Sequence, residues 1–509
     1  MGSYFSKIKA YVPYIIISLL AIVWNLLTMH NSLPWCDEVM LVDTPANMYF
    51  YGEWATTAYN QMGEGTIPFA TYMPLYIWVI YGWIVLFGFS FLKVRMCEIV
   101  TTFILGFAIL RLLKVYREKQ LSPFAMIIFS LGFWFTDIMS LTYRMARPDM
   151  LGALMAFLLF IYIVKSLKYS HRKYICQILL FSGLSIIAGL QSGIFVIASL
   201  LFACLFVRPV KQMVRPFLYV IAGFVAGMVV AFAYMACFGE AKAYAFAIID
   251  ASATLHSLWL SARGIILPLL GKTVREIPVA VANDESASFV KNTIEIFTFI
   301  GFFLLFILMV VLHIFNKPIL KIKERKLSII LALFSVYIIF FFNLAGRYQT
   351  YYMWTAAIPV LLSVVLFIDD EVSKICGGLV CLVIALGAFV SIRNMGSIFG
   401  DTYDRIVSFV KKQNFKSDSS IGTVFSTYYA LKPQFKNAYW YEVYPISRVK
   451  NFEYIIFPNP QKDKLHYKYV TLGSMQLKME QLKSDSAYSV KMIDTMIEPS
   501  LSIYSIKKK

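Results

Sequence analysis

Three observations predict that this chain is an all-α polytopic membrane protein with a small α/β domain at its C-terminal end. Of its 509 residues, 59% are hydrophobic and only 15% are charged, and the mean hydropathy is +0.68. These values exclude a soluble chain of this length. Apolar runs long enough to cross a bilayer recur along most of the sequence, and the composition becomes lysine-rich from about residue 395.

Twelve apolar runs have a length suited to a membrane crossing, which takes roughly 17 to 25 residues. If all twelve crossed, the basic loop 111–119 would share a side with the acids that follow the first run, against the positive-inside rule. The run 71–92 contains Pro74, Gly82, Gly88 and many aromatic residues, so we expect it to lie in the membrane interface. The eleven remaining runs are 11–29, 96–115, 122–141, 148–164, 174–190, 193–207, 216–238, 293–315, 327–345, 348–368 and 375–392.

Eleven crossings place the N-terminus in the cytoplasm together with the basic clusters at 7–9, 111–119, 165–173, 208–215 and 317–326. The net charge of +18 therefore reflects membrane topology, and no nucleic-acid partner is expected. The seven cysteines are scattered without a Cys-x-x-Cys spacing, which indicates neither a disulfide framework nor a zinc site.

This topology divides the chain into two domains. Residues 1–394 form the transmembrane domain, with a first outer loop at 30–95 and a large outer loop at 239–291. Residues 395–509 form an extracytoplasmic α/β domain of the usual domain size. Within it, we expect an amphipathic helix at 404–413 and strands at 421–426, 440–444, 452–457 and 502–506.

Acidic and basic residues from distant parts of the sequence meet on the outer face in this topology. A carboxylate can accept a proton from an incoming nucleophile, and a guanidinium group binds phosphate oxygens in a bidentate way. This combination favours chemistry on a phosphate or pyrophosphate carried by a lipid. The residues are Asp37 and Glu38 after the first crossing, Arg147 and Asp149 in a short turn, and Arg347 with Tyr348 in a later turn.

The order of several short motifs resembles a known family. They are Asp37-Glu38, Ile67-Pro68-Phe69-Ala70-Thr71-Tyr72-Met73-Pro74-Leu75-Tyr76, Leu86-Phe87-Gly88-Phe89-Ser90 with Arg95, Ala146-Arg147-Pro148-Asp149, and Arg347-Tyr348 before Pro359. Together they resemble the C-type glycosyltransferases, and within them the protein O-mannosyltransferases and lipid A aminoarabinose transferases. The resemblance is strongest over residues 11–170, looser to 395 and absent in the tail.

The resemblance implies a hexosyl- or pentosyltransferase that works on the extracytoplasmic face. Its donor would be a sugar on a polyprenyl phosphate, its acceptor a protein, lipid or glycan, and transfer would invert the anomeric carbon. The implied roles are Asp37 as base with Glu38 beside it, Asp149 as second acid, and phosphate binding by Arg95, Arg147, Arg347 and Tyr348.

Two features depart from the family pattern. The usual His before the Pro-rich aromatic segment is missing, and the second loop has the single Asp149 in place of Asp-x-Asp. No cofactor is implied with certainty, and a divalent cation, if one binds, would be held by Asp37 and Asp149.

Two other classes stay open from the sequence. A lipid or polysaccharide transporter would carry ionisable groups near the bilayer midplane, and a polysaccharide polymerase or ligase would carry its key residues in a late loop. The chain has no Asn-x-Ser/Thr sequon, which favours a bacterial inner membrane with the C-terminal domain in the periplasm.

The topology makes a direct prediction. A reporter fused near Glu118 should be cytoplasmic, and one fused after residue 400 should be external, because the basic loops stay inside. Reporter activity in cells measures both positions. An external reporter at Glu118 would mean that 71–92 crosses the membrane, and the acids would then lie on the wrong side for this account.

Overall fold

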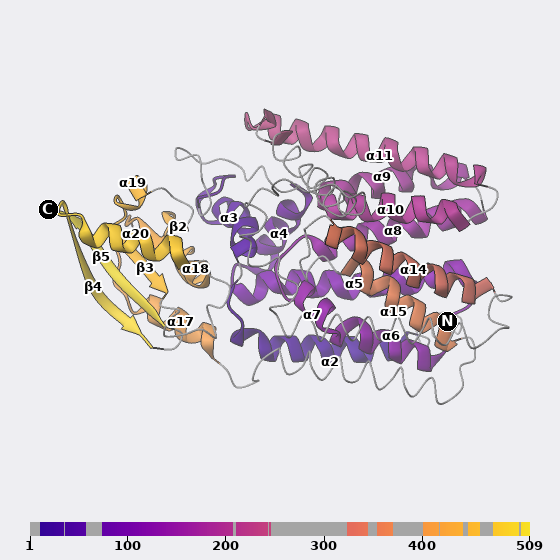
Figure 1. Ribbon diagram of the computed structural model, residues 1–509, viewed down its shortest axis with the longest axis horizontal. Coiled ribbons are helices and arrows are strands. Elements are labelled where there is room, and N and C mark those ends of the chain that lie inside the picture. Colours follow the sequence, from indigo (N-terminus) through magenta and orange to yellow (C-terminus); the bar gives the residue numbers. More distant parts are fainter. Residues whose placement is uncertain are drawn as a thin grey trace, which may run out of the picture.

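The computed structural model describes residues 11–34, 36–57, 74–169, 171–206, 210–242, 244–245, 323–344, 354–369, 401–416, 418–440, 446–458, 472–497 and 500–509. In this part of the chain most residues are helical. Long helices run side by side along the long axis, and a β-sheet lies at one end of them (Figure 1).

Three helices of the described chain are long and apolar enough to cross a membrane: α5 (Phe91–Arg117), α8 (Asp149–Lys168) and α11 (Lys211–Ala236). They confirm the predicted helical membrane class, whereas the number of eleven crossings stays a prediction. The shorter helices of the bundle are α2 (Val12–Thr28), α6 (Pro123–Phe135), α7 (Asp137–Tyr143), α9 (His171–Ala188), α10 (Leu190–Phe206), α14 (Lys323–Leu344) and α15 (Trp354–Asp369).

Helix α15 is the most deeply buried of the described helices. Its residues from Trp354 to Ile368 are all buried, and it packs against α6, α7 and α14. By contrast, α11 buries a narrow stripe that includes Gly223 and Gly227, which approach Gly183 of α9 closely. Small residues allow such close helix contact in membranes, and the broad apolar remainder of α11 is exposed as a lipid-facing surface would be.

Two segments differ from the sequence expectations. The predicted crossing 122–141 is divided, because the backbone is extended at Thr136, whose hydroxyl donates back to the Gly132 carbonyl at 2.8 Å. The acids expected in a loop lie instead in the first turn of helix α3 (Cys36–Tyr51), where the positive end of the helix dipole favours carboxylates.

The aromatic run 71–92 forms helix α4 (Pro74–Phe87), which is separated from α5 by a turn at Gly88. Gly88 has a φ of +81°, a conformation that glycine adopts without steric cost. With 14 residues, α4 is about 21 Å long and shorter than the roughly 30 Å of a bilayer core. The predicted crossings 293–315 and 375–392 and nearly all of the loop 239–291 lie outside the described residues.

The described residues from 401 onward form a five-stranded sheet with helices packed on it. The strand order is β2-β1-β3-β5-β4, with β1 parallel to β2 and β3, and β5 antiparallel to β3 and β4. A separate apolar core lies between the sheet and its helices. The elements are α17 (Thr402–Lys411), β1 (Ile421–Thr423), α18 (Phe425–Leu431), β2 (Ala438–Trp440), α19 (Ile446–Val449), β3 (Tyr454–Pro458), α20 (Leu472–Ser484), β4 (Tyr488–Met496) and β5 (Leu501–Lys508).

Helices α3 and α4 lie between the bundle and this sheet (Figure 1). The acids of α3 therefore lie at the end of the bundle that faces the C-terminal part of the chain. Helix α5 starts at this end and is about 40 Å long, so Arg117 in its last turn belongs to the opposite end. At that opposite end Lys168 of α8 pairs with Glu118 at 2.7 Å.

Candidate active site

Glu38 and Arg95 form a buried ion pair between α3 and α5. The guanidinium Nε and Nη2 of Arg95 donate to the two carboxylate oxygens of Glu38, both at 2.7 Å, and each side chain is at most 3% exposed. This is the bidentate geometry that makes Arg–carboxylate pairs strong and directional. Glu38 Oε1, which accepts from Arg95 Nε, also accepts the backbone N–H of Ala146 at 2.7 Å. This hydrogen bond connects α3 to the turn before α8.

The other donors of Arg95 also bind protein groups. Its Nη1 donates to the Ser32 hydroxyl, its Nη2 donates to the Leu33 carbonyl at 3.1 Å, and its guanidinium carbon lies 4.1 Å from the centre of the Phe91 ring. Arg95 therefore joins α5, α3 and the segment that follows α2.

Arg147 joins the two aspartates that the sequence singled out. Its Nη1 pairs with Asp37 Oδ2, and its Nε pairs with Asp149 Oδ2 at 3.0 Å. Arg147 is 1% exposed and Asp149 is 2% exposed, whereas Asp37 is 16% exposed. Asp37 is thus the member of this triad that solvent or a substrate can reach.

The local sequence explains where Asp149 and Arg147 lie. Pro148 precedes α8 directly, and Asp149 occupies the first turn of that helix, where the dipole stabilises its charge. The indole of Trp354, at the start of α15, lies beside Asp149. The carboxylate therefore lies between two helices of the bundle.

Arg144 adds a third buried positive charge at this end. Its Nη1 donates to Asn25 Oδ1 at 3.0 Å and to the Thr28 hydroxyl at 2.8 Å, and its Nη2 donates to the Thr28 carbonyl at 3.3 Å. These groups form the last turn of α2, whose negative dipole end favours a cation. Burial lowers the pKa of Arg144 to about 10, so it stays charged at neutral pH.

Glu98 is a buried acid that the sequence interpretation did not place in the site. It lies one helical turn after Arg95, next to the buried Tyr76 of α4 and within electrostatic range of Glu38, Arg147 and Asp149. Its sequence signal is weak, because a lone acid at the start of an apolar run looks like a helix boundary.

The structure thus brings together five of the predicted residues: Asp37, Glu38, Arg95, Arg147 and Asp149. Arg347 and Tyr348 lie outside the described residues. Within the described ranges, no group of three or more His, Cys, Asp or Glu side chains could hold a metal ion. Between Asp37 and Asp149, the pair that the sequence offered for a cation, the guanidinium of Arg147 supplies the positive charge.

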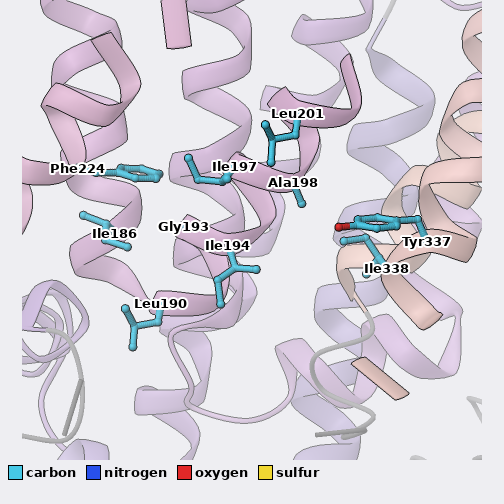
Figure 2. Close-up of a pocket in the computed structure, with 10 residues that line it drawn as sticks. All are labelled: Ile186, Leu190, Gly193, Ile194, Ile197, Ala198, Leu201, Phe224, Tyr337 and Ile338. Atoms are coloured by element: carbon cyan, nitrogen blue, oxygen red, sulfur yellow. The ribbon is translucent and has the colours of Figure 1, made fainter. Parts of the chain in front are cut away.

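An apolar cavity of about 340 Å³ lies among α9, α10, α11 and α14 (Figure 2). Leu190, at the start of α10, forms one end of the lining (Figure 2). Two residues later, Ser192 packs against Gly152, which is in the first turn of α8 with Asp149. The other lining residues are Ile186, Ile194, Ile197, Ala198, Leu201, Phe224, Tyr337 and Ile338.

Replacing each of the two neighbouring acids of α3 by its amide should change the free energy of unfolding by a different amount. Glu38→Gln leaves Arg95 buried without a counter-charge, so we expect a loss of about 3–5 kcal/mol in the free energy of unfolding. Asp37→Asn is the matched control, because Arg147 keeps Asp149 as a partner. Thermal denaturation of the purified proteins in detergent compares them. Equal melting temperatures for the two variants would contradict a structural role for the Glu38–Arg95 pair.

No family model and no curated protein sequence matches this chain. The solved structures that share its fold include ArnT and AglB. ArnT from Cupriavidus metallidurans bound to undecaprenyl phosphate aligns over 97% of both chains, with a TM-score of 0.57 and 11% identity. The archaeal oligosaccharyltransferase AglB from Archaeoglobus fulgidus, in complex with an inhibitory peptide and a dolichol-phosphate, aligns over 99% of this chain and 75% of its own, with a TM-score of 0.56 and 10% identity.

Both proteins are C-type glycosyltransferases, and the alignments cover nearly the whole chain. At 10 to 11% identity they show a shared fold and do not by themselves transfer an activity. The resemblance that the motifs predicted is therefore confirmed at the level of the fold.

Proposed function

We propose that this chain is an integral-membrane glycosyltransferase that moves a sugar from a polyprenyl-phosphate donor to a protein, lipid or glycan acceptor. The observation that carries the proposal is the partly exposed Asp37, paired with the buried Arg147 and Asp149 at one end of the helical bundle. The shared fold with ArnT bound to undecaprenyl phosphate and AglB bound to dolichol-phosphate supports the class of donor.

In the proposed reaction Asp37 is the general base. An acceptor O–H or N–H group attacks the anomeric carbon of the donor sugar and forms the new glycosidic bond. The bond from this carbon to the phosphate oxygen breaks with its electron pair, and polyprenyl phosphate leaves. The acceptor proton passes to Asp37, and attack from the face opposite the phosphate inverts the anomeric carbon.

Arg147 and Asp149 fix the base in this proposal. A guanidinium shared by two carboxylates restricts the rotation of the Asp37 side chain. The burial of Arg147 and Asp149 also removes competing water from their side of the triad, which strengthens the interaction. Alignment of the base and the two substrates is the main catalytic requirement, because a sugar phosphate is already activated.

Glu38 and Arg95 act as positioning residues in this proposal. The guanidinium of Arg95 donates its hydrogen bonds to Glu38, Ser32 and Leu33. The proposal therefore does not assign binding of the lipid phosphate to Arg95. The donor phosphate is assigned to the side of Arg147 on which Asp37 and Asp149 lie. Arg347 and Tyr348 are the further predicted contacts of this phosphate. Arg144 contributes positive charge at the same end.

The apolar cavity supports a lipid-linked donor. Its walls are aliphatic and aromatic (Figure 2). Near its Leu190 end, Ser192 of the same helix packs against Gly152 in the first turn of α8. An isoprenoid chain in this cavity would have its phosphate end near Asp149. The acids and the C-terminal sheet lie at the same end of the bundle (Figure 1). We propose that this end is extracytoplasmic, in a bacterial inner membrane with the C-terminal domain in the periplasm.

The test is transfer by purified protein from a panel of polyprenyl-phosphate sugars in detergent or nanodiscs. We expect Asp37→Asn to lower kcat by about 10³-fold, because loss of a general base typically costs 10²–10⁴-fold. The melting temperature should stay near that of the wild type. Asp404→Asn is the matched control, since Asp404 lies at the same end, is 57% exposed and pairs with His30.

Wild-type turnover by Asp37→Asn would rule out Asp37 as the base. Absence of transfer by the wild-type protein from every donor in the panel would contradict the glycosyltransferase proposal itself. Transfer that retains the anomeric configuration would contradict direct attack by the acceptor.

A further inference from the structure

We propose that the C-terminal part of the chain positions the catalytic helix α3, and that Lys432 is the positioning residue through which it acts. This inference rests on the proposed function, because it takes Asp37 of α3 as the base. It gives a role to a segment in which the sequence offered no resemblance and no site.

The contact is a buried ion pair between Asp43 of α3 and Lys432, which directly follows α18. Lys432 Nζ lies 2.9 Å from Asp43 Oδ1, and both side chains are fully buried. Tyr428 of α18 donates to the same oxygen at 2.5 Å. Lys432 Nζ also donates to the hydroxyl of Thr57 at 2.6 Å, so the lysine binds both α3 and the segment that follows it.

Asp43 is at the same time the anchor for the chain after α3. Its Oδ2 accepts the Thr57 backbone N–H at 2.5 Å and the Thr56 hydroxyl at 2.9 Å. The Tyr51 hydroxyl donates to the Lys432 carbonyl at 2.7 Å. Helix α3, the segment that follows it and α18 are therefore held together by one hydrogen-bond network around the buried carboxylate of Asp43.

This network lies close to the proposed base. Asp43 follows Asp37 by six positions on the same helix, a rise of about 9 Å. At the N-terminal end of α3, Glu38 is clamped by Arg95 and Ala146, and Arg147 holds Asp37. The helix is thus fixed at one end by the bundle and farther along by Lys432.

An aromatic contact connects the same two parts of the chain independently. Tyr403 of α17 and Tyr429 of α18 are buried against Phe91, with ring centres 4.5 and 5.4 Å away. Phe91 in turn lies under the guanidinium of Arg95, which holds Glu38 next to Asp37. A displacement of α17 and α18 would therefore affect the position of Asp37 through two sets of contacts, the Lys432–Asp43 ion pair and the aromatic contacts with Phe91.

The chemistry of Lys432 fits an anchor. Burial lowers the pKa of Lys432, while the charge of Asp43 beside it opposes this shift. Removing one member of a buried pair leaves the other charge without compensation, which makes such a contact sensitive to substitution. Lys436, a few residues later, pairs with Glu53 between the same two parts of the chain, but these side chains are 40% and 36% exposed.

The test compares Lys432→Met with Lys436→Met in the full-length protein. We expect Lys432→Met to lower kcat, expressed per folded molecule, by about 10- to 100-fold, because an error of about 1 Å in alignment can cost 10²-fold. The KM for the polyprenyl-phosphate sugar should stay within about twofold of the wild-type value. Lys436→Met should keep kcat within about twofold, since exposed ion pairs contribute little.

Hydrogen–deuterium exchange provides the readout that does not depend on activity. We expect faster exchange of the amides in α3 for Lys432→Met and unchanged exchange for Lys436→Met. A kcat of Lys432→Met close to the wild type, or a loss fully explained by the unfolded fraction, would overturn the proposal. So would unchanged exchange in α3.

If Lys432→Met does not fold, Tyr428→Phe replaces it, because this change removes one hydrogen bond to Asp43 and keeps the ion pair. A several-fold lower kcat with faster α3 exchange is expected, and wild-type values would overturn the proposal. Absence of transfer by the wild type would refute the enzymatic function alone, whereas unchanged α3 exchange in the variants would refute the positioning role.

Discussion

The structure depends on how buried charges are paired at one end of an apolar bundle. A charge away from water is costly unless other groups compensate it. Neutral oxygens of α2 bind Arg144, and other buried charges form ion pairs. Glu38 forms an ion pair with Arg95, Asp37 and Asp149 form ion pairs with Arg147, and Asp43 forms an ion pair with Lys432. The pairs of Asp37, Glu38 and Asp43 join α3 to segments that are far apart from it in the sequence, and they determine where α3 lies.

Helix α3 is consequently held in place from several sides. Arg95 reaches it from α5, the backbone of Ala146 from the turn before α8, and Lys432 from the C-terminal part of the chain. A short helix held in this way can present one carboxylate at a constant position, as a base that must meet two separate substrates requires. Of the three acids of α3 that form these pairs, Asp37 has the most accessible side chain. The same arrangement thus distinguishes the catalytic candidate from the acids that only hold the helix.

Much of the fold follows from the sequence, because a membrane imposes strong constraints on it. Apolar length identified the long helices α5, α8 and α11, and the motif Ala146-Arg147-Pro148-Asp149 marked the start of α8 correctly. The division of the run 122–141 at Thr136 was not predicted, because the break rests on the extended backbone and the local hydrogen bond of one residue. The helical state of α3 was also missed, because Pro45 and several polar residues mask its periodicity.

The candidate site was predictable in its residues but not in its pairing. Charge topology brought Asp37, Arg147 and Asp149 to one face, yet a single sequence does not reveal that Arg95 is bound by Glu38 or that Glu98 lies beside them. Lys432 illustrates the limit most clearly. It lies 389 positions after Asp43 in a lysine-rich tail, where its pattern resembles that of any solvated lysine. Its role emerges when the tertiary fold buries it next to a carboxylate.

In the proposed function, the phosphate of a lipid-linked donor binds at the Asp37 end of the bundle. Cryo-electron microscopy of the wild-type protein with a bound polyprenyl phosphate tests this most directly. We expect the phosphate within about 4 Å of the Arg147 side chain or the first turn of α8, with the isoprenoid chain running along α10. A phosphate bound at the opposite end, beside Arg117 and Lys168, would contradict both the site and the proposed orientation in the membrane.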